Sequence, residues 1–156
     1  MTARPAFIIH DLDQARAAAM AGVELSRPIL LLTPPDIAAA LGLHWLQELV
    51  RHLRREHPQA DLLAVFDCGD RAALGHEALR AGAGAICFVG PEDQARALAE
   101  VAAALGRVFF SSRPPALDLG RLSPKRRVAA AKAWIGNPAD RRNVDQGGIS
   151  GDPGRH

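Results

Sequence analysis

The chain has 156 residues, a formal net charge of +2 at neutral pH, and 48% hydrophobic and 23% charged residues, values that are ordinary for one globular domain. No apolar run approaches the roughly 18–20 residues that span a bilayer, which disfavours a membrane protein. The sequence also begins without a basic stretch followed by a long apolar region, so we expect no secretory signal and a cytoplasmic location.

Five apolar segments predict strands, and alanine- and leucine-rich segments between them predict helices. Continuous apolar runs of this kind are typical of strands in a parallel sheet, whose connections are crossover helices. The pattern predicts an α/β protein, a three-layer α/β/α fold around a mostly parallel sheet of about five strands, either flavodoxin/receiver-like or half-barrel-like. We expect the side chains of Leu63, Val65, Ile86, Phe88 and Val108 to be nearly fully buried. The predicted strands are Ala6–His10, Pro28–Thr33, Leu62–Phe66, Ala85–Val89 and Arg107–Ser112.

Local signals predict where the helices begin and end. Asp11 or Asp13 can cap the first helix, which Gly22 is placed to end, and Asp36 can cap the second. The second helix is the longest, at about residues 37–56, and Gly42 is expected to bend it near its start. Its last turns carry Arg51, Arg54 and Arg55, which we interpret as a solvated end.

The chain divides by composition into three parts. Residues 1–119 are expected to form the α/β domain, residues 120–135 a C-terminal helix that starts at Ser123-Pro124, and residues 136–156 a polar, disordered tail. The basic residues concentrate at the C-terminal side, because residues 1–112 carry a net charge of −3 and residues 113–156 a net charge of +5.

The C-terminal helix combines a basic first turn with an apolar stripe. Its cations oppose the helix dipole, whereas its stripe predicts that it docks on the α/β body or on a second copy of the chain. We therefore expect a homodimer or an acidic protein partner through this helix. Nucleic acid is disfavoured, because the basic run is short and no aromatic residues interleave it. The cations are Lys125, Arg126 and Arg127, and the stripe is Val128, Ala131, Trp134 and Ile135.

Polar side chains gather where the predicted strands end. Ligands of parallel α/β sheets bind at the carboxyl ends of the strands, so these residues form the candidate site. Asp67 and His10 are the candidate catalytic residues: Asp67 as a general base or a metal ligand, and His10 as a general acid or base. The alternative for Asp67 is that it caps the helix after Gly69, or that Asp70 caps this helix while Asp67 accepts hydrogen bonds from loop amides. The alternative for His10 is a hydrogen bond to the backbone. The candidate ligand-binding residues are Asp11, Asp13, Asp70, Ser112 and Arg113.

The motifs of bound cofactors and metals are not found in this sequence. No GxGxxG follows the first strand, no GxxxxGK[ST] occurs and no HExxH pair is formed, so no cofactor and no metal site are predicted. Cys68 and Cys87 lack CxxC spacing. Cys68 is interpreted either as a small core residue or as a nucleophile beside a helix N-terminus.

The order of the strand-end residues resembles that of the receiver domains of two-component signalling. Those domains have acids after the first strand, an acceptor Asp after the third and Lys-Pro after the fifth. Here Asp11 and Asp13, Asp67, and Arg113-Pro114 follow in that order over residues 6–115. Arg113 replaces the lysine, and Gly90 stands where a Ser or Thr belongs. The resemblance implies a degenerate receiver-like domain.

Two classes of function fit these patterns. The first is a non-catalytic regulatory or protein-interaction module. The second is a small lyase- or isomerase-like enzyme that acts on a phosphorylated or carboxylated metabolite at the carboxyl ends of the strands. An enzyme requires Asp67, His10 and Arg113 to converge on one open pocket, whereas a module allows Asp67 to be used by its own chain.

Overall fold

The computed structural model describes residues 4–137. Six strands and five α-helices follow one another along this part of the chain. Within it, no helix combines the length and the hydropathy that crossing a bilayer requires. The elements are β1 (Ala6–Ile8), α1 (Leu12–Glu24), β2 (Ile29–Leu32), α2 (Pro35–Glu56), β3 (Leu62–Asp67), α3 (Ala72–Arg80), β4 (Ala85–Cys87), α4 (Glu92–Ala104), β5 (Val108–Phe110), β6 (Ala116–Asp118), the 3-10 helix η1 (Leu119–Arg121) and α5 (Pro124–Gly136).

The six strands form one sheet in the order β5-β4-β3-β2-β1-β6, and every neighbouring pair is parallel. Flat, such a sheet would hold its edge strands about 24 Å apart, at five spacings of about 4.8 Å. Only residues 111–115 join the edges β5 and β6, and a segment of that length spans at most about 21 Å. The sheet must therefore curl, and residues 111–115, hereafter the strap, bridge its two edges.

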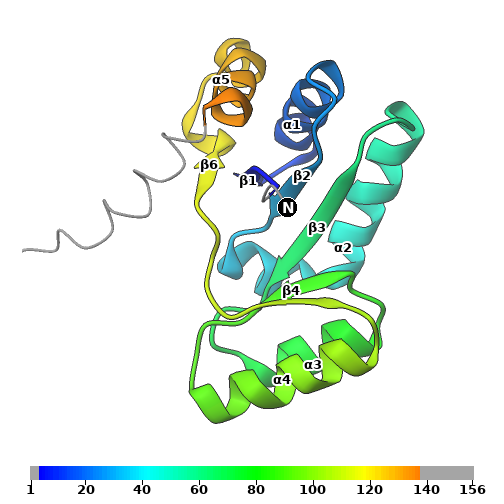
Figure 1. Ribbon diagram of the computed structural model, residues 1–156, viewed down its shortest axis with the longest axis vertical. Helices are drawn as coiled ribbons and strands as arrows, with labels where there is room; N and C mark the ends of the chain where they lie inside the picture. Colours follow the sequence, from blue (N-terminus) through cyan, green and yellow to red (C-terminus); the bar gives the residue numbers. More distant parts are fainter. Residues whose placement is uncertain (1–3, 138–156) are drawn as a thin grey trace, which may run out of the picture.

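The helices lie around the curled sheet. In Figure 1, α1 and α5 lie above the strands, α3 and α4 lie below them, and α2 runs along a third side. The α/β class, the parallel sheet and the C-terminal helix are thus as predicted. Helices lie on opposite sides of the strands, as the predicted α/β/α fold requires, although the curl of the sheet places their buried side chains against its outer face. The strand order matches the half-barrel-like alternative, since flavodoxin and receiver domains have the order 2-1-3-4-5.

The buried apolar residues form two separate clusters, one on each face of the curled sheet. One cluster contains buried residues from all five helices together with the outward-facing strand residues, among them Phe7, Phe66 and Ile86. The buried residues of the second cluster all come from the strands: Ala6, Leu30, Leu32, Val65, Ala85 and Cys87. Because side chains alternate along a strand, these are the inward-facing positions. The inner face of the sheet is therefore covered mainly by its own curvature.

The predicted core is confirmed at three of five positions. Val65, Ile86 and Phe88 are fully buried, but Leu63 is only half-buried and Val108 is 42% exposed. Both exceptions have a cause in the topology. Val108 lies on β5, an edge strand, where an apolar residue lacks a neighbour on one side, and Leu63 borders a cavity beside α2.

The helix signals were partly right. Asp11 is the N-cap of α1, and its side chain accepts a hydrogen bond from the Gln14 amide. Gly42 has φ +78° and marks the kink in α2. Asp36 does not cap α2, because Pro34 occupies the N-cap position. α1 continues past Gly22 to Glu24, since a glycine is compatible with a helical interior at modest cost.

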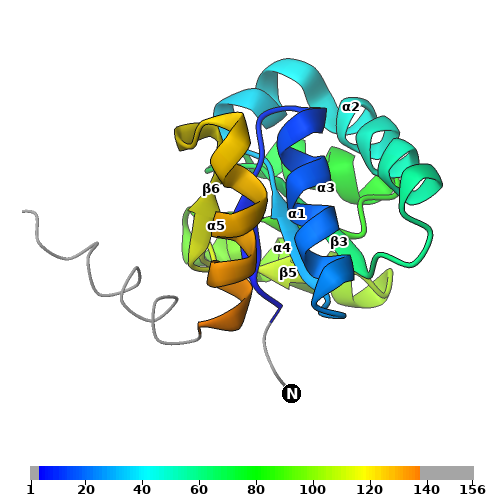
Figure 2. The same cartoon turned by 90° about the horizontal axis from the view of Figure 1, so that it is seen from above.

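The C-terminal helix α5 docks on its own chain. It packs beside α1, as Figure 2 shows, and the docked face carries the predicted stripe: Ala131, Trp134 and Ile135 are buried. The Trp134 indole donates a hydrogen bond to the Ala6 carbonyl at 3.0 Å, and Lys132 pairs with Glu24. The stripe is used within the chain, so a partner at this helix would meet its exposed cations. The predicted tail from residue 138 onward lies outside the described residues.

Candidate functional site

The carboxyl ends of the strands bring the predicted site residues to one edge of the curled sheet, but as two separate pairs. Asp67, the last residue of β3, pairs with Arg113 of the strap. His10, two residues after β1, pairs with Asp118, the last residue of β6. The two predicted catalytic residues, Asp67 and His10, make no direct hydrogen bond with each other.

The Asp67 carboxylate is occupied by its own chain. Its Oδ2 accepts a hydrogen bond from the Arg113 Nε at 2.6 Å, and its Oδ1 accepts bonds from Arg113 Nη2 at 3.3 Å and from the Gly69 amide at 2.9 Å. The Asp67 amide donates to the Thr33 hydroxyl. The hydrogen bond with Asp67 raises the pKa of the Arg113 guanidinium above its ordinary value. A buried carboxylate requires a partner of this kind, and Arg113 supplies a forked one.

His10 and Asp118 meet at 2.9 Å between the histidine Nε2 and Asp118 Oδ1. The same Asp118 oxygen accepts a hydrogen bond from the Gly120 amide. A Cβ at Gly120 would lie 2.5 Å from the His10 Cδ2, so the approach of the ring requires glycine at this position. Sequence reasoning missed Asp118, because the three residues of β6 give no strand pattern. This pair could move a proton, and it is partly open to solvent.

The remaining predicted ligand-binding residues are used in helices or exposed on the surface. Asp11 caps α1, and Asp13 pairs with Arg16 on the same helix. Asp70 and Ser112 are exposed, and among the described residues neither makes a side-chain hydrogen bond or ion pair. Over residues 4–137, no group of three or more His, Cys, Asp or Glu side chains is placed to hold a metal ion.

Both cysteine thiols are buried at the carboxyl ends of β3 and β4, and their surroundings do not favour the thiolate. Burial, reinforced by the Asp67 carboxylate, raises the pKa of Cys68 from 9.0 to about 12. The pKa of Cys87 is also raised to about 12, by burial and by Asp67, against an opposing effect of Arg113. Cys68 is therefore a core residue, as one of its two interpretations held, and a poor nucleophile near neutral pH.

We expect native protein to resist thiol labelling by an aromatic disulfide reagent at pH 8, whereas unfolding in urea should release two reactive thiols. The folded state holds these protons above pH 9 and the unfolded state loses them, so the free energy of unfolding should fall as the pH rises from about 9 towards 12. Labelling rates and urea titrations at several pH values check both expectations. Rapid labelling of either cysteine in the native protein would contradict the buried, protonated state.

Two cavities among residues 4–137 lie away from the predicted site. The larger cavity, about 620 Å³, lies beside α2 at the amino ends of β3 and β4, and a smaller one of about 270 Å³ lies near Ser26 and Asp61. None of the seven predicted site residues lines either of them. The larger cavity is hereafter the arginine groove, because Arg51, Arg54, Arg55 and Arg107 line it.

Comparison with known proteins finds no matching family model and no matching curated protein.

Proposed function

We propose that this protein is a non-catalytic α/β module with a regulatory or protein-interaction role. The observation that carries the proposal is the state of Asp67, the best candidate for a catalytic carboxylate. Arg113 and the Gly69 amide together use both of its oxygens, so no free carboxylate faces a substrate. The pair instead attaches the strap to the middle of the sheet.

The 3-10 helix η1 also lies at the strand ends, against β1. In open parallel sheets, ligands bind where the strand order reverses, which here is between β1 and β6. The 3-10 helix η1 begins directly after β6 and contacts β1, Leu119 is fully buried, and Gly120 lies against the His10 ring. The receiver analogy gives this proposal no further support, because the strand order differs and the acceptor-like Asp67 is paired.

A second candidate function is supported by one observation. The His10–Asp118 pair lies at the reversal of strand order, where a general acid or base of a small enzyme would be expected. A lyase- or isomerase-like enzyme that acts on a phosphorylated or carboxylated metabolite would use this pair, with Arg113 released to hold the anion.

A thermal-shift screen of the full chain separates the two functions. The compounds are phosphorylated and carboxylated metabolites, nucleotides and divalent metals, tested on wild type and on His10→Asn. A ligand at one hundred times its Kd stabilises the native state by about 2.7 kcal/mol, which is about 5–10 °C in Tm for a domain of this size. If the protein is a non-catalytic module, no metabolite should raise the Tm in a way that depends on His10. A shift that His10→Asn abolishes would establish the enzyme and overturn the module.

A further inference from the structure

The arginine groove has the charge of an anion-binding surface. Four guanidinium groups line it, and none of its lining residues is an Asp or Glu. Arg51 pairs with Glu48 beside the groove. The side chains of Arg54, Arg55 and Arg107 are exposed and make no ion pair with any described residue. Clustered cations repel one another, so a ligand with several carboxylates would be favoured here.

The floor of the groove is aliphatic. Leu43 of α2 and Leu63 of β3 line it as half-buried side chains, and the buried side chains of Leu46 and Val50 of α2 complete it. On α2 these residues have the spacing i, i+3 and i+7, which places them in one row along the helix. The lining contains no aromatic residue, so the stacking platform that single-stranded nucleic acids use is missing there.

The length of the arginine groove favours an elongated anionic ligand over a compact one. Its lining runs along α2 from Leu43 to Arg55, which at 1.5 Å per residue is about 18 Å, or roughly three helical turns. Arg54 and Arg55 come from α2, whereas Arg107 directly precedes β5, which lies two strands across the sheet from β3. Gln47 donates a hydrogen bond to the Ala81 carbonyl at 3.1 Å and so joins α2 to the end of α3. An elongated occupant with acids on both flanks fits such walls better than a compact metabolite.

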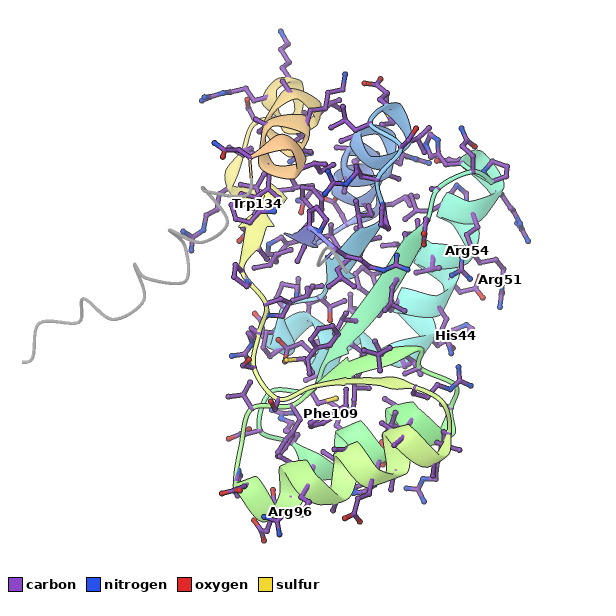
Figure 3. All side chains as sticks on the ribbon, viewed as in Figure 1. His44, Arg51, Arg54, Arg96, Phe109 and Trp134 are labelled. Carbon is purple, nitrogen blue, oxygen red and sulfur yellow. The ribbon has the colours of Figure 1, made fainter. Side chains whose placement is uncertain are left out.

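We propose that the arginine groove binds an acidic amphipathic helix of a protein partner. The partner's aliphatic residues would contact the floor, and its carboxylates would pair with Arg54 and Arg55 on one side and with Arg107 on the other. This inference rests on the proposed interaction role and adds to it a surface and a class of partner. Figure 3 shows Arg51 and Arg54 on α2, at the side of the molecule away from α5.

The test is a selection of helical peptides of about 16 residues, displayed as a library and captured by the full chain. We expect enriched peptides to carry leucines at i, i+4 and i+7 with flanking glutamates. Their affinity, measured by fluorescence anisotropy, should fall at least about tenfold in the double variant Arg54→Glu/Arg107→Glu and should weaken with added salt. The matched control is Arg96→Glu, an exposed arginine on α4 (Figure 3), which should change the affinity by less than about twofold.

Each other outcome is informative. If the enriched peptides bind the double variant as tightly as wild type, the arginine groove is not their binding surface and this inference is wrong, although the proposed interaction role would still stand. Decanoate or inorganic phosphate that raises Tm only when Arg54 and Arg107 are present, without any peptide binding, would make the groove a small-anion site and overturn the inference. A His10-dependent metabolite shift with no peptide binding would overturn the proposed function itself. Because both arginines are exposed and unpaired, the variants should keep the wild-type Tm in the absence of ligand.

Discussion

Replacement of Trp134 by alanine should lower the free energy of unfolding by about 3–5 kcal/mol, the usual range for deleting a large aromatic side chain from a core. Trp134 is 6% exposed and lies between α5 and the sheet, near β1 and β6 (Figure 3). The change would leave a cavity under α5 and remove the donor to the Ala6 carbonyl on β1. Urea unfolding, followed by circular dichroism, measures the loss.

Two further variants on α5 separate packing from hydrogen bonding and from surface charge. Trp134→Phe keeps most of the apolar contact and loses the indole N–H, so it should cost about 0.5–1.5 kcal/mol. Lys132→Ala removes only the surface pair with Glu24 and should cost at most about 1 kcal/mol. Equal losses for Trp134→Ala and Lys132→Ala would contradict the docking of α5 through its apolar stripe.

Arg113→Ala should destabilise the protein by about 1.5–3 kcal/mol, the range for hydrogen bonds to charged groups. The Asp67 side chain is 2% exposed, and it would lose the forked partner that neutralises it while keeping only the Gly69 amide. The Arg113 side chain is 45% exposed, so solvent can partly replace it, which places the loss below that of a fully buried pair. Arg121→Ala is the matched control, because the Arg121 side chain is 87% exposed and lies 3.6 Å from Asp118, so its loss should cost close to zero.

Much of the fold could be predicted from local patterns, and the exceptions have physical reasons. Five strands can be recognised in the sequence as continuous apolar runs, because parallel strands are buried on both faces. β6 has only Ala116 and Leu117 as apolar residues between Pro115 and Asp118, so the sequence contains no apolar run that would indicate a strand there. Its pairing with β1 joins residues about a hundred positions apart, and a sequence pattern carries no such information. The exposure of Val108 on the edge strand β5 could not be predicted either, because the order of strands in a sheet is a tertiary property.

The positions of the candidate residues could be predicted from the sequence, but not the bonds that they make. The carboxyl-end rule placed His10, Asp67 and Arg113 at one edge of the sheet, and the structure keeps them at that edge. Whether Asp67 meets a substrate or Arg113 depends on the path of the strap, which no local signal describes. The arginine groove was missed because Arg54 and Arg55 look like a solvated helix end, and only the fold brings Arg107 to face them.

A double-mutant cycle between Asp67 and Arg113 tests most directly whether the strand-end charges hold the chain together. The free energies of unfolding are measured for wild type, Asp67→Ala, Arg113→Ala and the double variant. If the pair is structural, the double variant should lose at least about 1 kcal/mol less than the two single variants together, because it leaves no unpaired buried charge. A coupling energy of zero would show that Asp67 is free of Arg113 in solution and available for a ligand, which would contradict the account.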